Sequence, residues 1–461
     1  MTCRYSSGFI LLTTALLLTG CTAGNKPFIR DFPQIAESGE INVLTLSGSM
    51  SYFIYKGEEM GYEYELIKSF ADANNLRINL IPAANETRLA EMLTQGKGDL
   101  IACNIPITKE GKNRFRYCGR ETIGEQVLVQ RANRKDTILK DVPELIGKEI
   151  RVIHGSKYEH RLRNLNNELG GGIIIRAIEQ DTITVEDLIE MVSRGEIAYT
   201  VSEAEMAKLN KTYYANLNIA LKISHPQRSS WATNRQSPEL ARRIDEWFEN
   251  NANTPRYRAI IKRYFEMSKL PGDAPAPVIG NGAISPFDTI FKQYAAKIPW
   301  DWRLMASIAF QESKFHTDKV SWAGATGLMG VMPKTAAAFD INPNDLINPE
   351  ASISSATGLI KRLNRSFAAI QDENERIKFI IAAYNAGSGH IYDAQALAGK
   401  YGKNPEIWEN NVEEYLKLKK LPEYYNDSVC KQGYCRGNET VHYVEAVLER
   451  WQYYKGLEIK N

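Results

Sequence analysis

Glu312 has the residue type and the position of a general acid. It ends a helix predicted over Trp302–Ser313, in which Met305, Ile308, Ala309 and Glu312 are spaced i, i+3, i+4 and i+7. This spacing places the carboxylate on the apolar face near the helix C-terminus. Burial and the negative helix end both favour a neutral carboxyl, so we expect a raised pKa. Such a group could protonate a leaving oxygen, although a structurally paired carboxylate would produce the same pattern.

Three separated sequence blocks accompany this glutamate. They are Gln311–Ser313 with Gly324–Met329, then Ala382–Gly387, then Glu439–Val444. In this order they resemble the catalytic domain of the soluble lytic transglycosylase family, which has an all-α, lysozyme-like fold. The residue types agree with this resemblance, because glycines let a glycan approach the backbone. Tyr384 and Tyr443 add apolar faces with polar tips.

The resemblance implies one carboxyl that works twice on peptidoglycan strands. Glu312 would protonate the oxygen between N-acetylmuramic acid and N-acetylglucosamine, then deprotonate the 6-hydroxyl that attacks C1. The product would carry a 1,6-anhydromuramic end. Most glycosidases need two carboxylates, and no second one stands near Glu312 in the motif. Ser313 is expected to orient Glu312, and the substrate-binding set is Ser313, Met329, Tyr384, Asn385 and Tyr443.

One position departs from that family. Gly330 follows Gly-Leu-Met, where the family usually has glutamine. A hydrogen-bonding side chain is therefore missing, either with the loss of a sugar contact or as plain loop variation. Two other functions stay open: a lysozyme-type hydrolase that uses water, and a transport-system binding lipoprotein whose helical domain only docks on the wall.

The N-terminus predicts export and lipid anchoring. Arg4 precedes the apolar run Phe9–Leu18, which is too short for a permanent membrane span. Leu18–Cys21 resembles the lipobox of bacterial lipoproteins, in which the cysteine is acylated and becomes the first mature residue. We therefore expect a periplasm-facing lipoprotein of the outer membrane, anchored through Cys21. The alternative is a plain secretory signal in which Cys21 is incidental.

Four cysteines remain after signal removal and lipidation. Outside the cytoplasm an even number permits disulfides. Cys430 and Cys435 lie in one short polar loop with Gly433, and we predict that they form a bridge. A bridge between Cys103 and Cys118 is left open, because Cys103 could be a buried small side chain.

The pattern of the whole chain predicts two domains. Strands alternate with helices from 41 to 201, which indicates a parallel sheet, and Ser237–Phe265 reads as one amphipathic helix. The expected order is a signal peptide 1–20, a tether 21–38, an α/β domain 39–268, a linker 269–284 and an all-α domain 285–461. A net charge of +2 argues against nucleic acid. No metal or cofactor is expected, since the six histidines are scattered.

The α/β part resembles the family 3 periplasmic solute-binding proteins, which bind amino acids between two hinged lobes. Gly61–Leu66, Gly98–Ile101 and Val152–Ser156 carry the resemblance. Ser156 and Glu203 are the expected ligand contacts, for a carboxylate and an amine respectively. The family's arginine is replaced by Gly111, which removes the bidentate clamp on a free α-carboxylate. Unless Lys112, Arg114 or Arg116 substitutes for it, we expect a peptide or muropeptide ligand, or none, rather than a free amino acid. A bound muropeptide would regulate the all-α domain.

Overall fold

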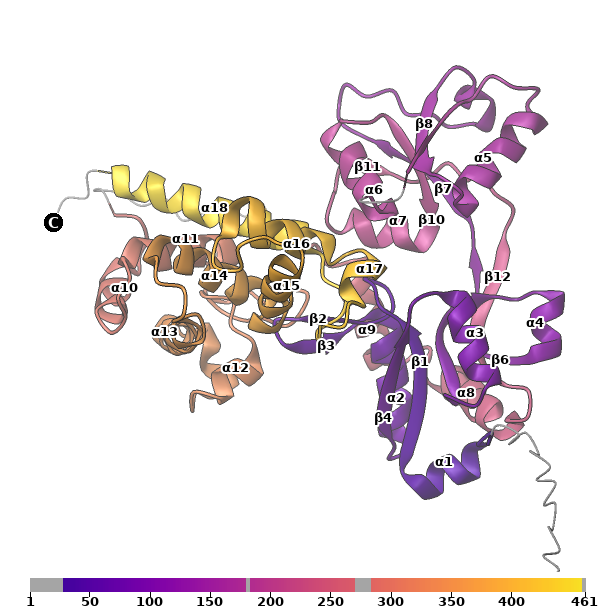
Figure 1. The fold of residues 1–461 in the computed structure, drawn as a ribbon, viewed down its shortest axis with the longest axis horizontal. Helices are drawn as coiled ribbons and strands as arrows, with labels where there is room; N and C mark the ends of the chain where they lie inside the picture. Colours follow the sequence, from indigo (N-terminus) through magenta and orange to yellow (C-terminus); the bar gives the residue numbers. More distant parts are fainter. Residues whose placement is uncertain (1–27, 180–182, 270–282, 458–461) are drawn as a thin grey trace, which may run out of the picture.

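The computed structural model describes residues 28–179, 183–269 and 283–457. It contains a two-lobed α/β domain and a helical domain that lies beside it (Figure 1). This is the predicted fold class. Cys21 and the lipobox lie outside the described residues. Among the residues that are described, no helix is long and apolar enough to cross a membrane.

The first lobe is built on a five-stranded sheet of order β4-β1-β5-β12-β6. The parallel strands are β1 (Glu40–Leu46), β4 (Arg77–Ala83) and β5 (Leu100–Pro106); β12 (Gln227–Asn234) runs antiparallel to β5 and to β6 (Phe115–Gly124). Its helices are α1 (Phe32–Ser38), α2 (Tyr62–Ala73), α3 (Glu86–Thr94), α4 (Lys109–Arg114), α8 (Pro238–Asn251) and α9 (Pro255–Phe265). The strands β1, β4 and β5 form the predicted parallel arrangement, and β12, which runs antiparallel to both of its neighbours, makes the sheet mixed.

The second lobe repeats this plan between β6 and β12. Its sheet has the order β11-β7-β10-β8-β9 and is also mixed. The strands are β7 (Gln126–Arg131), β8 (Glu149–Ile153), β9 (Ile174–Ile178), β10 (Tyr199–Glu203) and β11 (Leu217–Asn218), with helices α5 (Lys157–Glu168), α6 (Val185–Arg194) and α7 (Ala204–Lys211). Two chain segments join the lobes, one between β6 and β7 and one between β11 and β12. Two short connections of this kind permit hinge motion.

Two predicted boundaries need correction. Residues 32–38 form α1, not a tether, because Asp31 caps this helix and Ile35 is fully buried in the first lobe. The single helix predicted over Ser237–Phe265 is two helices, α8 and α9. Thr254 caps the second one and Pro255 opens it, and proline is tolerated in the first turn but not in a helix interior.

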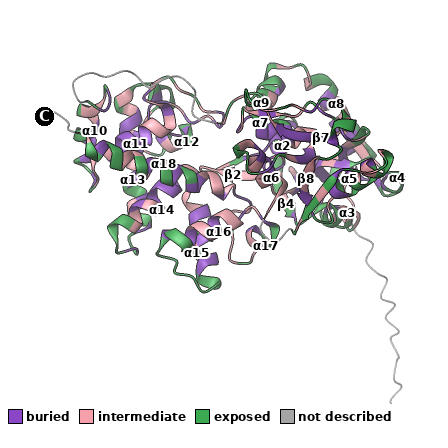
Figure 2. Cartoon of the chain, turned by 90° about the horizontal axis from the view of Figure 1, so that it is seen from above, coloured by how far each residue is buried: buried purple, intermediate pink, exposed green. Residues whose placement is uncertain are grey.

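The helical domain packs around one apolar core. Its helices are α10 (Asp288–Ala295), α11 (Trp302–Ser313), α12 (Pro333–Ala337), α13 (Pro349–Ser366), α14 (Glu373–Ala386), α15 (Ser388–Lys400), α16 (Glu413–Leu418), α17 (Pro422–Tyr425) and α18 (Gly437–Gly456). Figure 2 shows α11 buried inside this domain. The long C-terminal helix α18 packs against both α11 and α14. This packing brings the ends of three separated sequence blocks together.

The predicted disulfide between Cys430 and Cys435 is wrong for this structure. Both are free thiols, as are Cys103 and Cys118. Cys435 is buried in the core of the helical domain, and its backbone N–H donates to the carbonyl of Lys419 at 3.1 Å. Cys430 is half-buried at the margin of that core. The packing of Cys435 explains why short sequence separation did not produce a bridge.

A two-stranded hairpin leaves the first lobe and reaches the helical domain (Figure 1). It consists of β2 (Phe53–Tyr55) and β3 (Glu58–Met60). Lys56 and Gly57 form its tip with φ values of 51° and 80°, as a two-residue hairpin turn with two positive φ angles requires. The sequence pattern does not predict strands for these residues. We call residues 53–60 the tip hairpin.

Candidate active site

Glu312 lies in the last turn of α11. Asp301 caps the start of this helix, and Lys314, with φ 52°, ends it. The helix therefore has the predicted bounds, and Met305, Ile308 and Ala309 are fully buried. The Tyr443 hydroxyl, on α18, donates a 2.8 Å hydrogen bond to Glu312 Oε1. Residues 131 positions apart thus meet at one carboxyl group.

The tip hairpin adds a second partner that the sequence did not suggest. Lys56 Nζ lies 3.1 Å from Glu312 Oε1 and 3.2 Å from Oε2. Only 7% of the lysine side chain and 10% of the glutamate side chain are exposed. The ammonium group of one domain and the carboxyl of the other thus form a nearly buried ion pair. In this conformation the glutamate is therefore paired and covered by the other domain.

Gly330 lies directly against the same carboxyl. Its φ is 58°, and a Cβ built on it would lie 2.2 Å from Glu312 Oε2. Its carbonyl oxygen is 3.4 Å from Lys56 Nζ. Gly330, which stands where the family usually has glutamine, therefore leaves room for the ion pair between Glu312 and Lys56.

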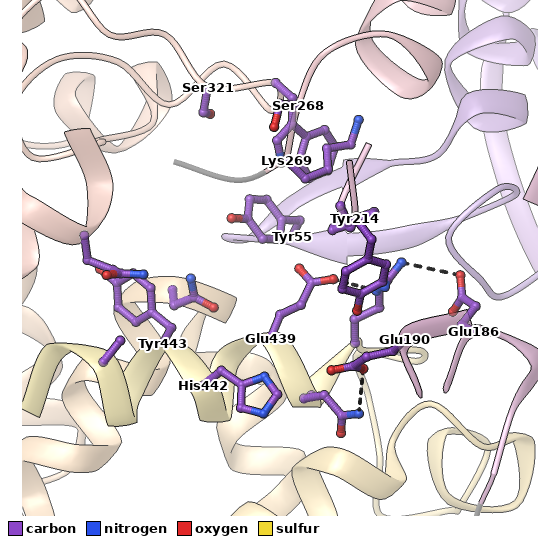
Figure 3. Close-up of a pocket in the computed structure, with 18 of the residues that line it drawn as sticks. Tyr55, Glu186, Glu190, Tyr214, Ser268, Lys269, Ser321, Glu439, His442 and Tyr443 are labelled. Atoms are coloured by element: carbon purple, nitrogen blue, oxygen red, sulfur yellow. Dashed lines mark hydrogen bonds and ion pairs between the residues drawn. The ribbon is translucent and has the colours of Figure 1, made fainter. Parts of the chain in front are cut away.

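A cavity of about 620 Å³ opens beside Glu312, and Figure 3 shows residues that line it. The predicted residues Asn385 and Tyr443 line it together with Glu312. Its other walls come from the tip hairpin, α6 of the second lobe and the chain after α9, through Tyr55, Glu186, Glu190 and Lys269. The cavity is therefore formed jointly by both domains.

Glu439 is a carboxyl that the sequence reading left out of the site. It rises from α18 into this cavity (Figure 3) and forms an ion pair with Arg436 at 2.5 Å. Burial raises the pKa of Glu439 to about 7, against the opposing effect of Arg436. The expectation of no second carboxyl was based on the block around Glu312 alone. The signal was present in the third block, where Glu439 stands four residues before Tyr443.

Three of the predicted substrate contacts are used inside the protein. Ser313 is buried and donates to the carbonyls of Ala309 and Leu328, at 3.0 and 2.8 Å. Met329 is fully buried, and its carbonyl accepts the Tyr384 hydroxyl at 2.7 Å. In this structure these side chains hold the loop that carries Gly330. That Ser313, Met329 and Tyr384 contact the substrate stays a prediction.

A second cavity of about 320 Å³ lies on the other side of the tip hairpin. Ile54, Lys56 and Gly57 line it from the hairpin, opposite Tyr384, Ala386 and His390 of the helical domain, among other residues. Tyr55 lines the first cavity. The hairpin tip thus lies between two cavities. Glu312 lines the first, and Gly330, which lies against Glu312, lines the second.

The predicted ligand contacts of the N-terminal domain are already paired. The Gly155 N–H donates to the Glu159 carboxylate at 2.7 Å, and the Ser156 hydroxyl donates to the Ile153 carbonyl at 2.6 Å. Glu203 forms an ion pair with Lys157 at 2.9 Å. The turn expected to hold a ligand carboxylate therefore holds one from its own chain.

Comparisons with known proteins agree with this arrangement. Residues 42–267 match the model of bacterial extracellular solute-binding proteins, family 3, and residues 289–407 match the transglycosylase SLT domain. A membrane-bound lytic murein transglycosylase F of Aeromonas salmonicida is 30% identical over 97% of this chain and 88% of its own length. This chain belongs to the membrane-bound lytic murein transglycosylase F family. A relative of the same name from Pseudomonas fluorescens is 28% identical over 96% of this chain and 89% of its own.

The family match covers both domains and the hairpin between them. Residues 53–60 lie inside the solute-binding match, while Glu312, Gly330 and Asn385 lie inside the transglycosylase match. Among solved structures, an ancestral cationic amino acid solute-binding protein covers 51% of this chain and 99% of its own, with a TM-score of 0.44 and 17% identity.

Proposed function

We propose that this protein is a lytic transglycosylase that cuts peptidoglycan between N-acetylmuramic acid and N-acetylglucosamine, with Glu312 as its acid and base. The supporting observation is the position of Glu312, at the edge of a large cavity and hydrogen-bonded to Tyr443. Family membership supports the reaction class. The reaction leaves a 1,6-anhydromuramic end.

The proposed steps return the carboxyl to its starting state. Protonated Glu312 gives its proton to the glycosidic oxygen as the C1–O bond breaks. The resulting carboxylate takes the proton of the sugar's 6-hydroxyl while O6 bonds to C1. No water is consumed. One carboxyl therefore serves both half-reactions, and the Tyr443 hydroxyl fixes its orientation.

Hydrolysis is a second candidate, and Glu439 is the observation that favours it. A second carboxyl in the same cavity could activate water, as in inverting glycosidases. Burial raises the pKa of Glu439 to about 7 despite the ion pair with Arg436, which suits a general base, so only the products separate the two reactions. Mass spectrometry of the products from purified peptidoglycan separates the two reactions, since anhydro and reducing ends differ by one water. Only reducing ends would contradict the proposal.

The wall-docking lipoprotein of a transport system fits the site less well. Glu312 and Tyr443 are paired at a cavity edge, which docking alone does not need. Product analysis also tests this alternative, because such a protein would release no fragments.

We infer that the N-terminal domain regulates the enzyme. The tip hairpin places Lys56 in an ion pair with Glu312 and leaves only 10% of the glutamate side chain exposed, so the hairpin must withdraw before a glycan can reach the carboxyl. Closure of the two lobes on a ligand could move the hairpin, because α6 of the second lobe also contacts the helical domain through Lys420 and Asp187.

We propose that the regulatory ligand of the N-terminal domain is a wall peptide. Gly111 supplies no guanidinium, and Glu159 fills the turn at Gly155, so a free α-carboxylate lacks both of its usual partners. Calorimetry with muropeptides and with free amino acids tests this. Tight binding of amino acids alone would contradict it.

The proposed anchor is a lipid on Cys21 at the periplasmic face of the outer membrane. It is supported by the Leu18–Cys21 lipobox and by the membrane-bound relatives. Cys21→Ser should release the protein from membrane fractions. A Cys21→Ser protein that stays bound after a salt wash would refute the anchor.

A further inference from the structure

His390 lies at the point where the tip hairpin covers the helical domain. It stands on α15 and is buried. Its Nε2 is 2.9 Å from the carbonyl oxygen of Ile54 in the hairpin. Beside it, the Lys56 N–H donates to the carbonyl of Ala386 at 3.1 Å. The hairpin backbone is therefore bound by one donor and one acceptor of the helical domain.

Two buried charges fix which nitrogen of His390 carries its proton. Lys419 Nζ is 3.0 Å from His390 Nδ1 and 2.5 Å from Asp393 Oδ2, and its side chain is fully buried. An ammonium group only donates, so Nδ1 must accept and the proton resides on Nε2. Burial and Lys419 lower the pKa of His390 to about 3. The imidazole is thus a permanent Nε2–H donor.

Asp393 is held in place in turn. It accepts the backbone N–H groups of Lys431 and Gln432, at 2.9 and 2.8 Å. A buried ion pair is costly unless its remaining bonds are satisfied, and these are. Asp393 and Lys419 thus fix the tautomer of His390, whose Nε2–H points out of the helical domain toward the hairpin.

Withdrawal of the hairpin would leave this N–H and the Ala386 carbonyl facing the second cavity, which both residues line. Tyr384, which borders Lys56, lines the same cavity. A donor and an acceptor side by side match a secondary amide, which offers one carbonyl and one N–H. An unpaired buried donor is expensive, so the open enzyme requires a substrate group or water there.

We propose that His390 Nε2–H and the Ala386 carbonyl bind a secondary amide of the substrate strand, and that the tip hairpin occupies their places with its own backbone amides. This inference rests on the proposed function. The amide belongs either to the 2-acetamido group of a sugar or to the peptide attached to it. Lys419 and Asp393 are positioning residues, since they act through His390.

The test compares matched peptidoglycan strands: intact, chemically de-N-acetylated, and freed of peptide by an amidase. Full-length wild type, His390→Ala and His390→Gln are assayed on each by kcat/KM. Removing the recognised amide should cost the wild type about five- to tenfold, as one hydrogen bond typically does. His390→Ala, in which only the Ala386 carbonyl still contacts the amide, should lose a clearly smaller factor, while His390→Gln, which keeps an N–H donor, should retain the wild-type ratio.

The ratio between substrates isolates the contact, because any loosening of the hairpin changes all three rates equally. If the loss in His390→Ala is smaller than in wild type on de-N-acetylated strands, the amide belongs to the acetamido group. If it is smaller on peptide-free strands, the amide belongs to the peptide. Wild-type ratios in His390→Ala on both altered strands would overturn the proposal. His390→Leu replaces His390→Ala if the latter melts early, and His225→Gln, at an exposed position, is the control. Anhydro products in every variant keep this outcome separate from failure of the proposed function.

Discussion

Lys56 and Glu312 belong to different domains and form an ion pair of 3.1 Å at the edge of the active-site cavity. Under the proposed function, in which Glu312 is the acid, this ion pair and the tip hairpin between the two cavities correspond to a resting state. Catalysis then depends on the fraction of molecules in which the hairpin has withdrawn.

Lys56→Ala should activate the purified protein. A charge-assisted hydrogen bond contributes about 1.5–3 kcal/mol, so its loss should raise the open fraction, and the rate of muropeptide release, by at least about tenfold. Lys334→Ala is the control, because its 3.5 Å pair with Glu58 on the same hairpin lies at the surface and such pairs contribute little. Unchanged or lower activity of Lys56→Ala would refute the resting-state interpretation.

Gly330→Ala should impair the site through steric contact. The new Cβ would lie 2.2 Å from Glu312 Oε2 and 3.0 Å from its Cβ, so the carboxyl must move away from Tyr443. We expect at least a tenfold loss of kcat, as misplaced catalytic groups typically cause. Gly324→Ala introduces similar backbone strain in the same loop, at φ 91°, with no atom within 4 Å. Equal losses in the two variants would assign the effect to strain.

Stability should fall as pH rises from about 4.5 to about 8 because of Glu63. Burial raises the pKa of Glu63 to about 8, although Ser51 and the Asn104 N–H donate to its carboxyl. The folded state thus binds its proton more tightly than the unfolded state, whose pKa is near 4.5. The stabilisation is complete below pH 4.5 and is lost as pH rises through 8. Glu63→Gln should flatten this decline in thermal melting, by up to a few kcal/mol.

The exposed Glu37→Gln serves as the control for that pH series. A Glu63→Gln protein whose melting temperature falls with pH as steeply as that of the wild type would show that Glu63 does not carry the effect.

Cys430 and Cys435 should both be alkylated when the protein is unfolded without reductant. Burial raises the pKa of Cys430 to about 11 and that of Cys435 to about 12, so in the folded protein both should react slowly. Cys430, which is half-buried, should react first. Peptide mapping that finds the two residues joined would contradict the structure.

The sequence predicted the helix of Glu312 well but not its partners. The bounds of α11 were correct, because its apolar spacing coincides with a capping residue, Asp301, at the start and with Lys314, at positive φ, at the end. Tyr443 was placed near the site only through the family motif. Lys56 could not be predicted, since the strands of its hairpin have three residues each and its partner lies 256 residues away.

The α/β domain shows a related limit. Alternation of helices and strands identified β1, β4 and β5, but β12 joins their sheet from a position more than 120 residues later and runs antiparallel. Long-range pairing of this kind leaves no local pattern. Glu439 lies in the third sequence block, four residues before Tyr443, but only the packing of α18 shows that it reaches the cavity beside Glu312.

The most direct test of the central claim is product analysis of Glu312→Gln in the Lys56→Ala background, where the hairpin no longer pairs with the acid. Glutamine keeps the shape and hydrogen bonds of the side chain but cannot transfer the proton. The rate of anhydro-muropeptide release should fall at least about 10²- to 10⁴-fold, with melting and wall binding preserved. Near-normal release of anhydro-muropeptides by the folded variant would contradict the assignment of Glu312 as the acid and base.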